Sequence, residues 1–169
     1  FLLELIGALV MMPTFIRDFG AKGIWMSFFH SISAFCNAGF DIMGTEGAKF
    51  ASITSYLGNS VINVTIMLLI VIGGIGFLTW EDVCTNKLHF KRYRMQSKVI
   101  LVTSALLILL PAVFFFFVDF ADMPMKERVL GSLFQAVTPR TAGFNTADLT
   151  AMTGTGQAII IVLMLIGGS

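Results

Sequence analysis

The stretch Val137-Thr-Pro-Arg-Thr-Ala-Gly-Phe-Asn145 is a polar turn set between apolar segments. A shorter counterpart lies upstream, at Phe35-Cys-Asn-Ala-Gly-Phe-Asp41. Each Ala-Gly-Phe follows an apolar run too short to cross a bilayer, which takes about 20 residues in a helix. A lone tripeptide of this kind is an ordinary tight turn. Two of them in the same place relative to their neighbours predict two re-entrant loops of one pore.

Composition favours a membrane protein. Of the 169 residues, 56% are hydrophobic and only 12% are charged, whereas a soluble domain has about 25% charged residues. The formal net charge of +1 gives no sign of a nucleic-acid partner. Both ends interrupt apolar segments, so we expect a fragment of a longer, multi-pass protein of the cell (plasma) membrane in contact with lipid.

Two uncharged segments are long enough to span the membrane, Leu57–Leu78 and Val99–Val118. The segment 83–98 between them is basic, because five of the 11 Lys and Arg residues fall between positions 87 and 98. The positive-inside rule predicts a cytoplasmic loop at 83–98. Both Ala-Gly-Phe loops then lie on the external side.

The chain shows the same order of segments twice: apolar helix, short apolar run, Ala-Gly-Phe loop and spanning helix. Residues 29–33 align with residues 134–138 if one residue is gapped, and Gly73-Gly74 corresponds to Gly167-Gly168. We therefore predict an all-α membrane protein with two pore units, 1–82 and 99–169, joined by the loop 83–98. Each unit is a helix, a pore helix, a filter loop and a second helix.

Such loops suit cation transport for physical reasons. Rings of backbone carbonyls can replace the water shell of a cation, and glycine reaches the backbone dihedrals that turn carbonyls inward. A short helix that stops halfway points its negative C-terminal end at the ion. The run Val129–Val137, ended by Pro139, fits that role.

Two quoted segments, Ser31-Ile-Ser-Ala-Phe-Cys-Asn-Ala-Gly-Phe-Asp41 and Phe134-Gln-Ala-Val-Thr-Pro-Arg-Thr-Ala-Gly-Phe-Asn145, resemble the second and third pore loops of the Trk/Ktr/HKT superfamily. They are most similar to the Ktr-type potassium-uptake subunit, also described as subunit J of a sodium-translocating ATPase. Leu69-Ile-Val-Ile-Gly-Gly-Ile-Gly-Phe77 is similar to the second helix of the second repeat. The resemblance covers essentially the whole chain.

The resemblance implies a pore of four repeats, of which this chain holds about two, in a homodimer with a cytoplasmic nucleotide-binding regulatory subunit. It implies that K+ is bound by the backbone carbonyls of Asn37, Ala38, Gly39, Thr141, Ala142 and Gly143. Phe40 and Phe144 would wedge the loops from behind, and Asp41 and Asn145 would stand at the pore mouth. A gate below the filter would begin at Gly167, Gly168 and Ser169.

Three further groups of residues have structural interpretations. We expect Arg140 to turn away from a cation path and to pair with a carboxylate or bind carbonyls behind its loop. His30 is expected to be a hydrogen-bonded scaffold residue of the short helix. Gly73, Gly74 and Gly76 indicate close helix packing.

The predicted function is uptake of K+, with Na+ as a second candidate ion, through a pore lined by the two loops. No nucleotide motif and no catalytic constellation is present within the spans, so we predict no enzyme activity and no nucleotide bound by this chain. Two alternatives stay open, a Na+-coupled K+ carrier and a non-transporting membrane scaffold. A scaffold would tolerate serine at Gly39 and Gly143.

Overall fold

A computed structural model describes residues 1–44, 52–86, 89–140, 142–147 and 152–167, without the side chain of Lys91. Every regular element within these ranges is helical, so the predicted all-α class is confirmed for the described part of the chain. The α-helices are α1 (Leu2–Phe19), α2 (Lys22–Phe35), α3 (Ser60–Gly74), α4 (Phe77–Asn86), α5 (Met95–Phe117), α6 (Met125–Val137) and α7 (Gly154–Ile166). Short 3-10 turns lie at Thr54–Tyr56, Phe90–Arg92 and Thr138–Arg140.

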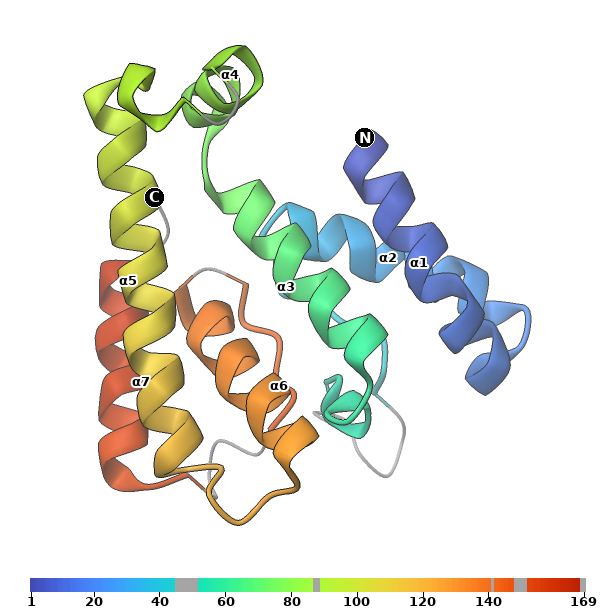
Figure 1. Ribbon diagram of the computed structural model, residues 1–169. Helices are drawn as coiled ribbons and strands as arrows, with labels where there is room; N and C mark the ends of the chain where they lie inside the picture. The colour runs from blue at the N-terminus through green and yellow to red at the C-terminus, as the bar shows by residue number, and fades with distance from the viewer. Residues whose placement is uncertain (45–51, 87–88, 141, 148–151, 168–169) are drawn as a thin grey trace.

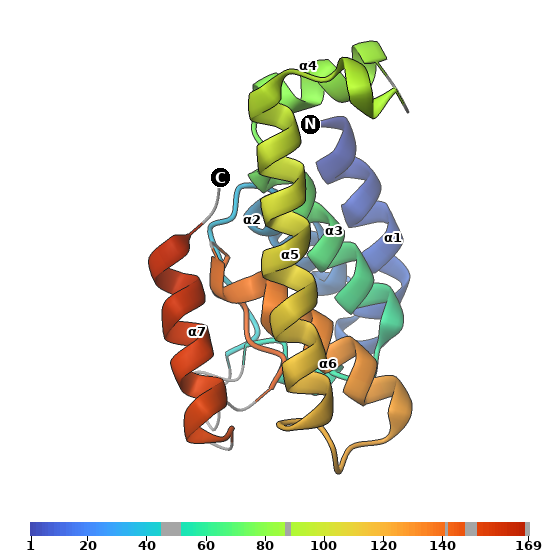
Figure 2. The same ribbon diagram turned by 60° about the vertical axis from the view of Figure 1, so that its left-hand side comes forward.

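The helices pack as two neighbouring groups. Helix α1 packs against α2 and α3, and α5 packs against α6 and α7, while α3 and α6 connect the groups. Figure 1 shows the short helices α2 and α6 ending inside the molecule, after which the chain turns back. Figure 2 shows α4 lying across one end, beyond the last turn of α3 and the first turn of α5.

Each group has its own hydrophobic core. Phe15 of α1 and Ile66 of α3 belong to the first cluster, which also takes in Phe134 of α6 and Phe144. The second cluster lies among α5, α6 and α7 and contains Phe115. Because α6 and the loop after it contribute to the first core, the two groups form one packed body.

Polar caps fix where two of the long helices begin. The Asn59 side chain accepts hydrogen bonds from the backbone N–H groups of Val61 and Ile62, which caps α3. The Thr153 hydroxyl accepts from Gly156 N–H at the start of α7. The carboxylate of Asp119 then accepts from both Thr153 N–H and Thr153 Oγ1, at 2.8 Å each, and so fastens α7 to the end of α5.

Helix α5 fits the predicted span at Val99–Val118. Its 23 residues have a mean hydropathy of 2.8 over the best window, and at 1.5 Å per residue they reach about 34 Å, enough to cross a hydrocarbon core of about 30 Å. Helices α3 and α4 pass the same test of length and composition only when taken together, with a bend of 100° between them.

The continuous span predicted at Leu57–Leu78 is wrong. Helix α3 ends at Gly74, and Gly76 adopts a left-handed φ of 86° before α4 begins. Gly73 packs closely as expected, because a Cβ there would overlap the carbonyl oxygen of Phe35 at the end of α2. Gly76 has nothing within 4 Å of a Cβ position, so this glycine marks the break and does not serve packing.

The segment 83–98 also differs from the loop that we predicted. It holds the end of α4, the 3-10 turn at Phe90–Arg92 and the first turn of α5, which begins at Met95. The polar residues that suggested a loop lie in the helical corner where α4 meets the start of α5, and side-chain contacts of Asp82 and Arg94 hold this corner together. The unit boundaries at 82 and 99 remain predictions.

Candidate ion pathway

Two loops carry the predicted ion ligands. The first loop, residues 36–41, follows α2, and the second loop, residues 141–145, follows α6 and its 3-10 turn. Gly39 and Gly143 have φ values of 69° and 79°, in the left-handed region where a side chain is strained. Asn37 also has a positive φ, 52°, a conformation that asparagine tolerates better than most residues.

A hydroxyl at the end of each short helix holds the loop that follows. Ser33 Oγ donates to the Phe40 carbonyl at 2.8 Å, and Thr138 Oγ1 donates to the Phe144 carbonyl at 2.7 Å. The backbone carbonyl of Ser33 accepts from Ala38 N–H at 2.9 Å, and that of Thr138 accepts from Gly143 N–H at 3.0 Å. The Thr138 carbonyl also accepts from the N–H of Ala142, the counterpart of Ala38, at 3.1 Å, so both loops are held by the hydroxyl and the backbone carbonyl of one residue.

The two loops touch each other at their glycines. A Cβ on Gly39 would overlap the backbone carbonyl oxygen of Ala142 and would lie 3.4 Å from the Cα atom of Gly143. A Cβ on Gly143 would meet nothing within 4 Å. Loops that are about 100 residues apart in the sequence thus lie side by side, and only glycine fits at position 39.

The two phenylalanines have different surroundings. Phe144 is fully buried, with its ring centroid 6.3 Å from that of His30. Phe40 is 70% exposed and borders an apolar groove with Trp25 and Ile32. Phe144 is therefore packed inside the protein, whereas Phe40 is mostly uncovered by the described residues; that the two rings wedge their loops from behind stays a prediction.

The predicted mouth residues are held by hydrogen bonds, local ones at Asp41 and long-range ones within the chain at Asn145. Asp41 Oδ1 accepts from Met43 N–H at 3.2 Å. Asn145 is fastened through its backbone, which accepts from Ile53 N–H at 3.1 Å and donates to Ser52 Oγ at 3.2 Å. Thr141, Gly168 and Ser169 lie outside the described residues, so of the predicted gate only Gly167 is placed, at the C-cap of α7.

The scaffold behind the loops contains two buried polar side chains. His30 is fully buried with Nδ1 2.7 Å from the Met26 carbonyl, which confirms its predicted scaffold role. Gln135, which aligns with His30 when residues 29–33 are matched to 134–138, is buried as well. The sequence analysis did not identify Ser33 and Thr138 as the residues whose hydroxyls hold the loops. Their matching positions in the aligned segments 29–33 and 134–138 could have indicated it.

Arg140 binds a carbonyl, which was one of the two alternatives predicted for it. Its Nε donates to the Gly167 carbonyl at 3.4 Å and its Nη2 donates to Ser104 Oγ of α5 at 3.3 Å. None of the ion pairs among described residues involves Arg140. The carbonyl alternative is therefore the one that the structure shows.

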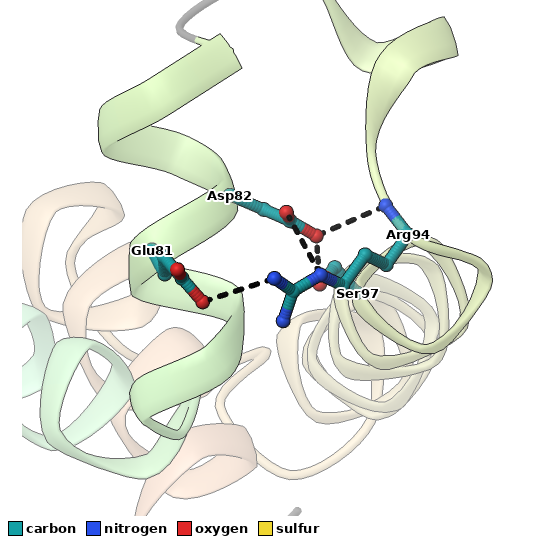
Figure 3. A network of polar contacts seen from close by, with 4 residues as sticks. All are labelled: Glu81, Asp82, Arg94 and Ser97. Carbon is teal, nitrogen blue, oxygen red and sulfur yellow. Dashed lines mark hydrogen bonds and ion pairs between the residues drawn. The ribbon is translucent and has the colours of Figure 1, made fainter.

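At the far end of the molecule, Asp82 joins α4 to the start of α5 (Figure 3). Its Oδ2 accepts from Ser97 Oγ at 2.6 Å and from Arg94 N–H at 3.0 Å, while the Arg94 side chain pairs with Asp82 Oδ1 and with Glu81. The hydroxyl of Ser97, together with the N–H and charge of Arg94, holds the pKa of the Asp82 carboxyl below its usual range. This network fastens α4 to the first turn of α5.

The chemistry available at the loops is that of backbone oxygens. Among the described residues no three His, Cys, Asp or Glu side chains gather in a way that could hold a metal ion. The backbones of the two loops are in contact where the Ala142 carbonyl meets Gly39, and hard monovalent cations are bound by rings of backbone carbonyls.

Comparison with known proteins gives consistent matches over the whole chain. A family model described as "Cation transport protein", TrkH, matches residues 1–169. The chain is 35% identical to the potassium/sodium uptake protein NtpJ of Enterococcus hirae, over 99% of this chain and 37% of that protein. It is 33% identical to the Ktr system potassium uptake protein B of Bacillus subtilis, over 98% and 37%, and 32% identical to the protein of the same name from Vibrio alginolyticus, over 97% and 36%. The chain thus spans a little over a third of the length of these relatives.

Proposed function

The chain belongs to the TrkH family of cation transport proteins, and from that premise we propose that it supplies two of four pore units of a potassium-uptake protein. K+ passes the membrane between the loops, and Na+ is the second candidate ion, since one relative is named for both. Members of this family are membrane transporters and not enzymes. We propose the same for the full protein to which these two pore units belong.

The observation that carries the proposal is the shared closure of the two loops. Ser33 and Thr138 occupy equivalent positions, and each hydroxyl donates to the carbonyl of the phenylalanine that follows Ala-Gly. Tight turns that arose independently have no reason to share a donor, an acceptor and a left-handed glycine. The match supports two copies of one pore unit, with α2 and α6 as the pore helices.

In the proposed pathway the ion is bound by backbone oxygens of Asn37, Ala38, Gly39, Thr141, Ala142 and Gly143. The contact between Gly39 and Ala142 supports this arrangement, because it brings the two loops to one place. Asp41 and Asn145 stand at the external mouth, where the charge of Asp41 concentrates cations. The end of α7 at Gly167, with the residues after it, forms the gate below the loops.

The corner between α4 and α5 faces the cytoplasm in this proposal. Arg92, Arg94 and Lys98 support that orientation by the positive-inside rule. The bend of 100° at Gly76 turns α4 away from the direction of α3, consistent with a helix at the membrane surface. The full protein works in the cell membrane as a homodimer with a cytoplasmic nucleotide-binding regulatory subunit.

The test compares glycine variants in the full-length protein, expressed in cells that lack their own K+ uptake. Gly39→Ser is expected to lower K+ uptake or its preference over Na+ by tenfold or more, because the side chain overlaps the Ala142 carbonyl. The matched control is Gly154→Ser, since Gly154 has an ordinary φ and open space around its Cβ position. Normal uptake and ion preference in Gly39→Ser would contradict the pore and favour a scaffold.

A coupled carrier is the second candidate, and the potassium/sodium name of one relative is the observation in its favour. Ion currents separate the two candidates. A pore gives K+ currents without Na+ and resolvable single-channel steps, whereas a carrier needs both ions and turns over too slowly to show such steps.

A further inference from the structure

The dipeptide Asp-Phe stands at the end of α1 and again just beyond α5. Asp18 Oδ2 accepts from the Tyr56 hydroxyl at 2.8 Å, and Asp119 Oδ1 accepts from the Thr153 hydroxyl, also at 2.8 Å. Each donor lies in the chain between a loop and the helix that follows it, α3 or α7. In both helix groups a carboxylate at the end of one helix therefore holds the segment that leads into another.

The segment held by Asp18 comprises residues 52–57 and is called the strap below. Tyr56 is buried, and its ring lies edge-on to that of Phe15 of α1, with the centroids 5.5 Å apart. On the side of α6, a Cβ on Gly131 would lie 3.2 Å from the Leu57 side chain. Figure 1 shows the short turn before α3 beside the start of α6. The strap thus lies against both helix groups.

The strap also holds the end of the second loop. Ser52 Oγ accepts from Asn145 N–H at 3.2 Å, and Ile53 N–H donates to the Asn145 carbonyl at 3.1 Å. The Ile53 carbonyl in turn accepts from Tyr56 N–H at 3.0 Å, so these two residues belong to one tight turn. The second loop is therefore held near its start by Thr138 and at its end by a segment from the other helix group.

The two oxygens of the Asp18 carboxylate have different partners. Oδ1 pairs with Arg17 Nε at 2.9 Å, and the Arg17 side chain is 73% exposed. Oδ2 accepts from the hydroxyl of the buried Tyr56. An exposed ion pair contributes little to stability, whereas a polar group in a buried site that loses its partner is costly. The bond to Tyr56 is therefore the one that fixes the strap.

We propose that Asp18 and Tyr56 are positioning residues, whose hydrogen bond holds the strap and, through it, the end of the second loop. The inference rests on the proposed function, in which backbone oxygens of that loop bind the ion. Without the bond the Tyr56 ring still packs on Phe15, but the strap is fixed less firmly and Asn145 varies more in position. Carbonyl rings discriminate between K+ and Na+ through the arrangement of their oxygens, so the K+/Na+ preference falls.

The experiment measures K+ and Na+ flux into liposomes that contain the purified full-length protein, together with amide hydrogen exchange of peptides that cover residues 142–147. Tyr56→Phe is expected to lower the K+/Na+ preference about two- to fivefold, the scale of one lost hydrogen bond, and to speed exchange in these peptides. Asp18→Ala should do the same. Asp18→Asn keeps an acceptor oxygen and should stay near wild type. Combining Tyr56→Phe with Asp18→Ala should add nothing further, because both changes remove the same bond.

Two control variants are matched to these changes. Tyr93→Phe alters the other tyrosine of the chain, which is also buried but lies beside Phe90 in the corner between α4 and α5. Arg17→Gln removes the exposed ion pair of Asp18 and leaves its bond with Tyr56. Both controls should keep the wild-type preference and exchange. A fall in either control equal to that in Tyr56→Phe would overturn the proposal.

The remaining outcomes also decide. Wild-type preference in folded Tyr56→Phe contradicts the proposal, whether or not exchange becomes faster. If Tyr56→Phe does not fold, Ser52→Ala decides, because it removes the acceptor of Asn145 N–H: a similar fall in preference supports the proposal, and no fall contradicts it. A wild-type protein that carries neither K+ nor Na+ would refute the proposed function. Unchanged exchange in Tyr56→Phe would refute the hold of the strap on the loop and leave the proposed function standing.

Discussion

The first and second loops are closed by the same hydrogen bonds but packed in different surroundings. In both, a hydroxyl at the end of a short helix donates to the carbonyl of the phenylalanine after Ala-Gly. At the first loop Gly39 lies directly against the Ala142 carbonyl and Phe40 is exposed. At the second loop Gly143 faces open space and Phe144 is fully buried.

The difference separates two requirements that the proposed ion pathway places on each loop. The backbone must adopt a left-handed turn, which both glycines provide. The loop must also pack against its surroundings. The first loop does so at Gly39, against the Ala142 carbonyl, and the second does so through the buried ring of Phe144. Each requirement can be tested separately, by changing one loop and using the other as its control.

The largest expected effect comes from alanine at the two glycines in the full-length protein. Gly39→Ala adds a backbone overlap to the left-handed strain, whereas Gly143→Ala adds only the strain, about 1–2 kcal/mol. We expect at least a tenfold loss of K+/Na+ preference for Gly39→Ala and a smaller loss for Gly143→Ala, measured as the ratio of uptake rates. Equal losses would show that space at Gly39 is unimportant.

The next effect concerns the two phenylalanines. Phe144→Ala empties a fully buried site and should destabilise the protein by about 3–5 kcal/mol, seen as a lower Tm of the protein purified in detergent. Phe40→Ala should lower Tm much less, because the ring is mostly exposed in these two units. A larger loss at Phe40 would show that another part of the full protein covers that ring.

How far the sequence could predict this structure depends on the kind of feature. The short helices, the loops after them and the span in α5 followed from apolar runs, Pro139 and the paired Ala-Gly-Phe. The break after Gly74 did not, because apolar residues continue through it and only the left-handed Gly76 interrupts the helix. The contact of Gly39 with Ala142 is tertiary, and no local pattern contains it.

A smaller effect is expected from the hydroxyls that close the loops. Ser33→Ala and Thr138→Val each leave a phenylalanine carbonyl without its donor, which destabilises by about 1–3 kcal/mol. Tm should fall and K+/Na+ preference should weaken in both variants. Ser132→Ala is the control, because its buried hydroxyl donates within α6, to the Val129 carbonyl. Similar results for all three would mean that the loop bonds have no special role.

The smallest effect on ion preference is expected at the corner far from both loops. The pKa of Asp82 is lowered in the folded protein, so its contribution to stability is present above the unfolded pKa of about 3.9. That contribution is lost as pH falls through the lower folded value. Asp82→Asn should lower Tm at neutral pH, reduce the difference between variant and wild type in acid, and leave K+/Na+ preference unchanged. An altered K+/Na+ preference in Asp82→Asn would mean that the contacts between α4 and α5 influence the structure of the two loops.

The most direct test of the account is to locate the ion in crystals of the full-length protein grown with Rb+, by anomalous scattering. We predict a peak in contact with the backbone oxygens of both loops, among them those of Gly39 and Ala142. The peak should be lost from Gly39→Ser crystals and kept in Gly154→Ser crystals. A clear peak elsewhere, with both loops empty, would contradict the account.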